Sequence, residues 1–165
     1  LLAARLRAAG AAPFGPCVTK TLPISGGDVG GSAGWPAFAA VQEKEGAALG
    51  LAATDAARIA RRYGSNASEV LRFAAEGSVL SEAERCGLPL DLYAELLYSI
   101  RCEQAVTPAD FWVRRTGDLY FRIDRVREWR GGVLELMARE HGYSAGERTR
   151  AAAELDRLLR EAAFA

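Results

Sequence analysis

The chain has 165 residues, of which 50% are hydrophobic and 25% charged, and its 21 basic and 21 acidic residues give a formal net charge of zero. This composition is typical of a globular domain and excludes a disordered or fibrous chain. The charge balance excludes a global electrostatic attraction to nucleic acid or anionic lipid. A chain of this length suits one domain with one hydrophobic core.

Two further features narrow the class of protein. The longest weakly apolar stretch, from Gly46 to Ala53, is far shorter than the roughly 20 residues that cross a bilayer, so we expect no transmembrane segment. Cys17, Cys86 and Cys102 form no CxxC pair, which argues against a disulfide framework and a zinc site and indicates a reducing, cytosolic setting. Because the chain begins at Leu1 without an initiating methionine or a leader, we interpret it as a segment of a longer protein.

Taken in chain order, residues 1–9 have the pattern of a helix end, with Gly10 as the stop. Residues 10–36 are rich in proline and glycine, and we expect a connector there with one short extended piece at 18–24. A connector of this length is unusual inside a compact domain, so we expect it to run along a partner surface. Residues 37–165 form the predicted helical domain.

Helix signals follow one another after Trp35. Thr54 is a predicted cap of a helix that ends at Tyr63, with Gly64 left-handed behind it. Asn66 and Glu69 repeat the start signal for a helix that closes at Gly77. Apolar residues at three-to-four spacing predict a central core helix over residues 90–104.

The second half of the domain has equally clear signals. Thr107, followed by proline, predicts the start of a helix that ends at Gly117. Asp124 is expected to open a helix that ends at Gly142. Ser144 and Glu147 predict a capping box for the last helix. Because no segment alternates convincingly with the period of a strand, we predict an all-α fold, a compact bundle of about six to seven helices preceded by the connector.

A complete catalytic, cofactor-binding or metal-binding set is not expected in these residues. His141 precedes a predicted helix stop, where a capping or surface role suits it better than catalysis. The glycines of residues 26–31 resemble a phosphate cradle, but they lack the Gly-Lys-Ser/Thr and GxGxxG patterns, so we interpret them as a linker turn. Six arginines with interleaved aromatics over residues 114–130 suggest a nucleic-acid surface, which we set below a structural role because arginine pairs readily with acids across helix contacts.

The most suggestive polar set lies around the turn at Val106 and Thr107. If the helices on either side form an antiparallel hairpin, Arg101 and Glu103 approach Arg114 and Arg115 closely enough for an ion-pair network. We predict that this network is structural.

Four strings in this order resemble a known family: TKTLPISGGD at 19–28, RRYGSN at 61–66, LYAELLYSIRCE at 92–103 and TPADFWVRRTG at 107–117. They are similar to the C-terminal helical domain of bacterial-type FAD-dependent glycerol-3-phosphate dehydrogenases and oxidases, and the likeness covers residues 19–163. The resemblance implies scaffolding or interdomain roles for Tyr63 with Gly64 and for Arg114 with Arg115. Arg62, beside Tyr63, is a further candidate for an interdomain or ion-pair role. No match to the calcium-binding extension of mitochondrial relatives is present.

The resemblance also implies a parent protein. An N-terminal FAD domain of the same polypeptide would bind the flavin and oxidise sn-glycerol 3-phosphate to dihydroxyacetone phosphate, passing electrons to a quinone or to oxygen. The family's flavin motif and substrate residues have no counterpart here, and residues 1–9 would correspond to the last helix of that domain. The implied setting is cytoplasmic, at the inner face of the cell membrane if the parent is a peripheral membrane protein, with homo-oligomerisation left open.

Two alternatives stay open from the sequence. The first is a stand-alone helical module for protein interaction or regulation, which the zero net charge and the connector suit equally well. The second is a nucleic-acid-binding helical domain that uses the arginines of residues 114–130.

Overall fold

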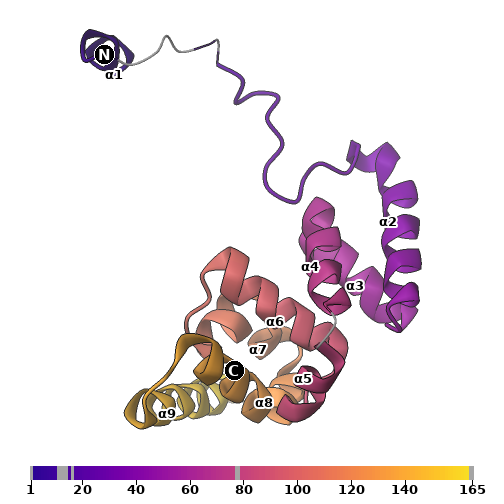
Figure 1. Ribbon diagram of the computed structural model, residues 1–165, viewed down its shortest axis with the longest axis vertical. Helices are drawn as coiled ribbons and strands as arrows, with labels where there is room; N and C mark the ends of the chain where they lie inside the picture. The colour runs from indigo at the N-terminus through magenta and orange to yellow at the C-terminus, as the bar shows by residue number, and fades with distance from the viewer. Residues whose placement is uncertain (1, 11–14, 16, 77–78, 164–165) are drawn as a thin grey trace.

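The computed structural model describes residues 2–10, 15, 17–76 and 79–163, and the regular structure among them is helical, with no strand. The predicted all-α fold class is therefore confirmed. The helices α2 to α9 pack into one body, and residues 17–30 extend from it (Figure 1). The short helix α1 (Leu2–Ala8) comes before them in the chain. The body consists of α2 (Gly31–Ala48), α3 (Ala53–Tyr63), α4 (Ala67–Ala75), α5 (Val79–Cys86), α6 (Leu90–Glu103), α7 (Asp118–Phe121), α8 (Ile123–His141) and α9 (Ala145–Ala162).

The helix α6 is the centre of the core, as its apolar stripe predicts. Leu92 and Leu96 are fully buried, and the helix packs against α3, α4, α5 and α8. It ends at Glu103, and Gln104 adopts a left-handed conformation with φ 57°. The predicted end at Gln104 is thus the cap of the helix.

The helical turn after α6 begins at Thr107, as predicted. The Asp110 amide donates to the Thr107 hydroxyl at 3.1 Å, and the Thr107 amide donates to the Asp110 carboxylate at 2.9 Å. The chain then winds into a π-helical turn, Asp110–Arg115, which buries Phe111 and Trp112 completely. Gly117, at φ 68°, separates this turn from α7 and so ends the element where the sequence predicts.

The last two helices close the core from one side. α8 begins after Arg122, so the prediction that Asp124 opens it is wrong by two residues, and Gly142 ends it with φ 66°. The predicted capping box is confirmed, because the Glu147 amide donates to Ser144 Oγ and the Glu147 carboxylate accepts from the Ser144 amide. α9 then buries Leu155 and Leu159, which belong to the hydrophobic core.

The described residues of the connector differ from the prediction at both of their ends. Residues 18–22 form a turn, with the Leu22 amide donating to the Val18 carbonyl at 2.9 Å, so the predicted extended piece at 18–24 is wrong. The helix α2 starts at Gly31, five residues before the predicted end of the connector, and carries Pro36 inside it. Packing of α2 on α3, with Phe38 against the core, outweighs the helix-breaking tendency of glycine and proline.

Two predicted caps around α3 and α4 are also wrong. Ala52 precedes α3 without a side-chain cap, and Thr54 lies inside the helix. Asn66 precedes α4, but its amide group donates to Ser25 Oγ at 2.9 Å and does not cap the helix. A tertiary contact therefore takes the side chain that the sequence assigns to a local role. The predicted stop at Gly77 lies outside the described residues.

Candidate functional site: a buried ion-pair network

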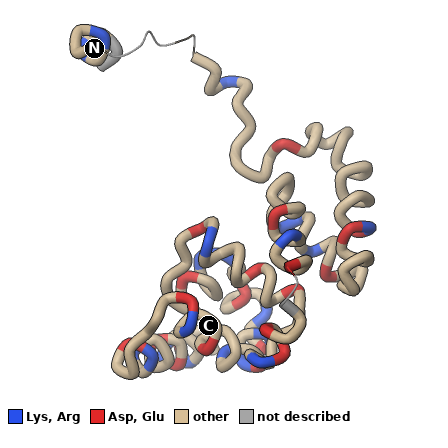
Figure 2. The backbone as a smooth tube through the Cα atoms, viewed as in Figure 1, with Lys and Arg blue, Asp and Glu red and all other residues tan. Residues whose placement is uncertain are grey.

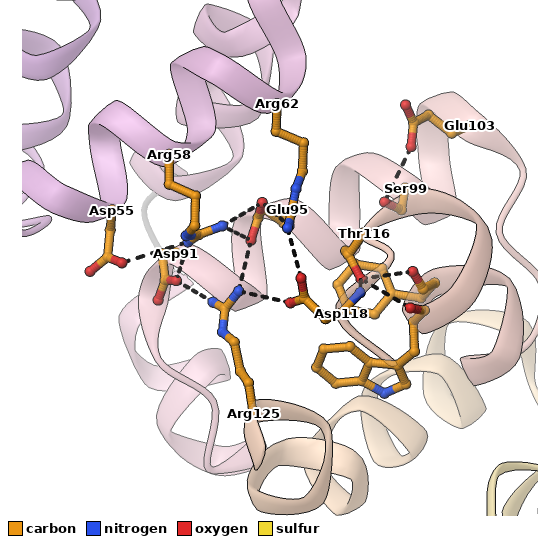
Figure 3. Close-up of polar contacts among 12 residues, drawn as sticks. Asp55, Arg58, Arg62, Asp91, Glu95, Ser99, Glu103, Thr116, Asp118 and Arg125 are labelled. Carbon is orange, nitrogen blue, oxygen red and sulfur yellow. Dashed lines mark hydrogen bonds and ion pairs between the residues drawn. The ribbon is translucent and has the colours of Figure 1, made fainter. Parts of the chain in front are cut away.

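Six charged side chains from four helices meet beside the core and form the densest polar cluster of the described residues (Figure 3). α3 supplies two arginines and α6 supplies two acids, each pair four residues apart and therefore on one face of its helix. α7 adds one acid and α8 adds one arginine. The members are Arg58, Arg62, Asp91, Glu95, Asp118 and Arg125.

Glu95 is at the centre of this network and is fully buried. Arg58 Nη1 donates to both of its carboxylate oxygens at 2.8 Å, and Arg62 Nη1 donates at 2.9 Å. Arg125 Nη1 lies 3.5 Å from the same carboxylate. One acid thus joins α3, α6 and α8.

The two other acids complete the links. Asp91 accepts from Arg58 Nη2 at 2.6 Å and from Arg125. Asp118, which is 1% exposed, accepts from Arg62 Nη2 at 2.7 Å and from Arg125 Nη1 at 3.3 Å. Every arginine of the network therefore contacts at least two carboxylates, and every carboxylate contacts at least two arginines.

The charges of these six side chains cancel, three against three, and the more exposed Asp55 also lies 3.7 Å from Arg58 Nη2 at the edge of the network. Burial by itself lowers the pKa of Arg58, but the attraction of Glu95 and Asp91 outweighs it and raises that pKa. Burial likewise lowers the pKa of Arg62, and Glu95 and Asp118 reverse the direction. The guanidinium groups of Arg58 and Arg62 therefore stay charged. They are paired with the carboxylates, which would have to be unpaired to act in proton transfer. The arrangement is chemically suited to fixing helices in place.

Arg62 is the predicted site residue that the structure places inside this network. Tyr63 follows it and is buried, and its ring makes a T-shaped contact with the ring of Tyr98 at a centroid separation of 5.3 Å. Burial, reinforced by the negative charge of Glu95, raises the pKa of Tyr63 well above its ordinary value. Its phenol is consequently held neutral.

The other predicted residues lie apart from the network. Arg115 Nη2 donates to the Glu103 carbonyl at 2.6 Å, and its Nε lies 3.9 Å from the Glu103 carboxylate, so the structure brings these two residues together. Arg101 instead contacts Glu140 at 3.0 Å, and Arg114 contacts Asp110. The four residues around the predicted hairpin do not form one network. These pairs are largely exposed and contribute little to stability.

Sequence reasoning missed five of the six network members: Arg58, Asp91, Glu95, Asp118 and Arg125. A signal was available for two pairs, because Arg58 with Arg62 and Asp91 with Glu95 are spaced to share a helix face. Asp118 and Arg125 have no such local signal. Arg62 and Asp118 are 56 positions apart in sequence, so their contact depends on the tertiary fold.

The remaining sequence candidates have structural partners. The Gly26 carbonyl accepts from the Ser65 amide at 2.9 Å, and His141 Nε2 lies 3.0 Å from the Ala105 carbonyl. In the arginine-rich segment, Arg127 lies 3.2 Å from Asp124 and Arg130 contacts Asp156. Figure 2 shows basic residues (blue) and acidic residues (red) interspersed along the helical body. Among the residues that the structure describes, no cluster of His, Cys, Asp and Glu is suited to a metal ion.

The fold and the network define an all-α helical domain whose buried charges hold helices together. Residues 17–148 match the family described as the C-terminal domain of alpha-glycerophosphate oxidase. The chain belongs to this family, which confirms the resemblance seen in the four sequence strings.

Relatives and a solved structure agree with this assignment. The chain is 41% identical over 158 residues to the aerobic glycerol-3-phosphate dehydrogenase of Bacillus subtilis, and 39% identical over 162 residues to that of Staphylococcus haemolyticus. These matches include 96% and 98% of the chain, respectively, but the chain spans only 28% of the length of each relative. The glycerol-3-phosphate dehydrogenase of Bacillus halodurans, solved in complex with FAD, matches with a TM-score of 0.83 and 40% identity, over 95% of this chain and 31% of that one. Within the described residues, no helix has the length and apolar character that a membrane span requires.

Proposed function

We propose that the chain is the C-terminal helical part of an FAD-dependent glycerol-3-phosphate dehydrogenase of bacterial type, and that it is itself non-catalytic. The parent enzyme would oxidise sn-glycerol 3-phosphate to dihydroxyacetone phosphate and pass the electrons to a quinone or to oxygen. The chain would serve as a scaffold attached to the part that binds FAD. Residues 1–9, 10–36 and 37–165 would be the end of the FAD domain, the connector and the helical domain.

The family assignment is the observation that supports this proposal most strongly. Relatives that are about 40% identical to the chain are named as aerobic glycerol-3-phosphate dehydrogenases. The matched part is the C-terminal part of those relatives. The buried network agrees with a scaffold role, because its acids and arginines neutralise one another.

FAD does not fit the residues that the structure describes. A dinucleotide fold needs a strand, a glycine-rich loop and a helix, whereas the described residues contain no strand. Of the connector glycines, Gly26 lies against the end of α3 and the turn behind it, and Gly30 and Gly31 begin α2 with no strand before them in the described residues. We therefore assign flavin binding and hydride transfer to the rest of the parent, in a cytoplasmic setting where peripheral contact with the cell membrane would occur through the parent.

The test begins with the reading frame that encodes residue 1. A continuous frame upstream with a glycine-rich flavin motif is expected, and the full-length product should be yellow and should oxidise sn-glycerol 3-phosphate with an artificial electron acceptor. A start codon beside Leu1, or a full-length product without flavin or turnover, would reject the proposal in favour of a stand-alone helical module.

A further inference from the structure

Residues 25–26 of the connector are hydrogen-bonded to residues 63–66 of the helical body, and we name this contact the glycine clasp. Ser65 donates its amide to the Gly26 carbonyl at 2.9 Å, and Asn66 donates its side-chain amide to Ser25 Oγ at 2.9 Å. A Cβ on Gly64 would meet the Gly26 carbonyl oxygen at 1.9 Å. A Cβ on Gly26 would likewise meet the Tyr63 carbonyl oxygen at 2.7 Å. Both segments of the clasp therefore need glycine, and the connector is held in one register.

The clasp also joins the connector to the buried network. Tyr63, whose carbonyl lies against Gly26, directly follows Arg62, and Arg62 is fixed by Glu95 and Asp118. The connector is thus attached to the end of α3, where Arg62 is paired with the network acids.

Residues 17–41, which comprise connector residues 17–30 and the first half of α2, are almost without charge. Lys20 and Asp28 are the charged residues in this stretch, while the chain as a whole has 21 basic and 21 acidic residues. Figure 2 shows the stretch as a nearly uncharged tube beside a body where both signs alternate. None of its residues is buried.

Large apolar side chains point outward along the same stretch. Leu22 is 64% exposed and Ile24 is 86% exposed on the connector, and Val41 is 51% exposed on α2. An exposed apolar surface that is held in place and has few charged residues is typical of a contact between proteins or domains. A solvated linker would instead be polar and unattached.

We propose that residues 17–41 are a docking surface for the FAD-binding part of the same polypeptide, with the glycine clasp fixing its position. The occupant follows from two observations. α1, which the proposed function assigns to the end of the FAD domain, precedes this surface in the chain. The chain also spans 28% of the length of its relatives, which leaves most of their length to lie against the surface. This inference rests on the proposed function.

Native cysteines allow a direct test with iodoacetamide and mass spectrometry. Cys17 lies in the proposed surface and Cys102 lies outside it at the end of α6, and both are exposed. In the 165-residue chain both thiols should react. In the full-length protein the ratio of the Cys17 rate to the Cys102 rate should fall by at least about ten-fold, because a docked surface excludes the reagent.

A matched pair of variants tests the apolar contact. Leu22 and Leu80 are both 64% exposed, but Leu80 lies on α5, outside the surface. In the full-length protein, Leu22→Glu should return the Cys17 rate toward its value in the 165-residue chain, and Leu80→Glu should leave it unchanged.

An unchanged rate ratio in a full-length protein that contains flavin and turns over substrate would overturn the docking surface while the proposed function stands. Absent flavin and turnover would reject the proposed function and, with it, the FAD-binding part as the occupant of this surface. Protection that grows with concentration in the 165-residue chain would assign the surface to a second copy and overturn the inference.

Discussion

Replacing Glu95 with glutamine tests whether the buried network holds the helices together. The substitution keeps the size of the side chain and removes its charge. Glu95 is fully buried and accepts from Arg58 and Arg62, with Arg125 at 3.5 Å. The variant would leave three arginines facing two acids, so the network gains one uncompensated positive charge.

The expected loss follows from this imbalance. Breaking a buried ion pair by removing one partner costs about 3–5 kcal/mol, since the remaining charge is desolvated without compensation. Glutamine retains one acceptor oxygen, and the arginines are 18% exposed or less, so we expect the lower end, about 3 kcal/mol. In a domain of this size that loss corresponds to a fall in Tm of roughly 6–12 °C.

Urea unfolding of the 165-residue chain, followed by circular dichroism, measures the loss. Glu69→Gln is the matched control, because Glu69 also pairs with an arginine, Arg72, but is exposed on α4. The control should leave the urea midpoint unchanged. If Glu95→Gln unfolds at the midpoint of the unmodified chain with the same slope, the network does not stabilise the fold and the reasoning fails.

Three further changes test other parts of the structure. Gly64→Ala should lower the free energy of unfolding by about 2 kcal/mol, since its Cβ would strike the Gly26 carbonyl oxygen, whereas Gly131→Ala, in open space on α8, should be neutral or stabilising; equal urea midpoints for the two variants would argue against the clasp. Ser144→Ala should cost about 1 kcal/mol by removing the capping box of α9, and an unchanged Tm would contradict that role. Partial burial raises the pKa of Asp110, but hydrogen bonds from Thr107 and Val106 outweigh it and lower that pKa. A lowered pKa stabilises the fold above the ordinary carboxylate value of about 4 and loses this contribution as the pH falls through the folded value. The Tm difference between the unmodified chain and Asp110→Asn should therefore be constant from about pH 7 to 5 and shrink below about pH 4, and a difference independent of pH would count against this account.

Elements determined by local sequence were predictable. The apolar spacing of Leu92, Leu96 and Leu97 identifies the core helix, because one stripe must face the other helices. Ser144 and Glu147 identify the start of α9, since both partners of the capping box lie within one turn. The family resemblance was also confirmed, because its four strings are ordered along the chain.

Features that depend on tertiary contact were not predictable in the same way. α2 forms across Gly34 and Pro36 because it packs on α3, which no local propensity reveals. The network joins Arg62 to Asp118 across 56 positions, and Asn66 leaves its predicted cap to bind Ser25 across 41 positions. Contacts over such separations require the fold itself to be known.

The measurement that tests the central claim most directly is the visible spectrum of the purified 165-residue chain, taken together with an assay of sn-glycerol 3-phosphate oxidation. We predict a colourless protein that folds cooperatively and leaves an artificial electron acceptor oxidised. Bound flavin, or turnover of the substrate by this chain alone, would contradict its assignment as a non-catalytic helical scaffold.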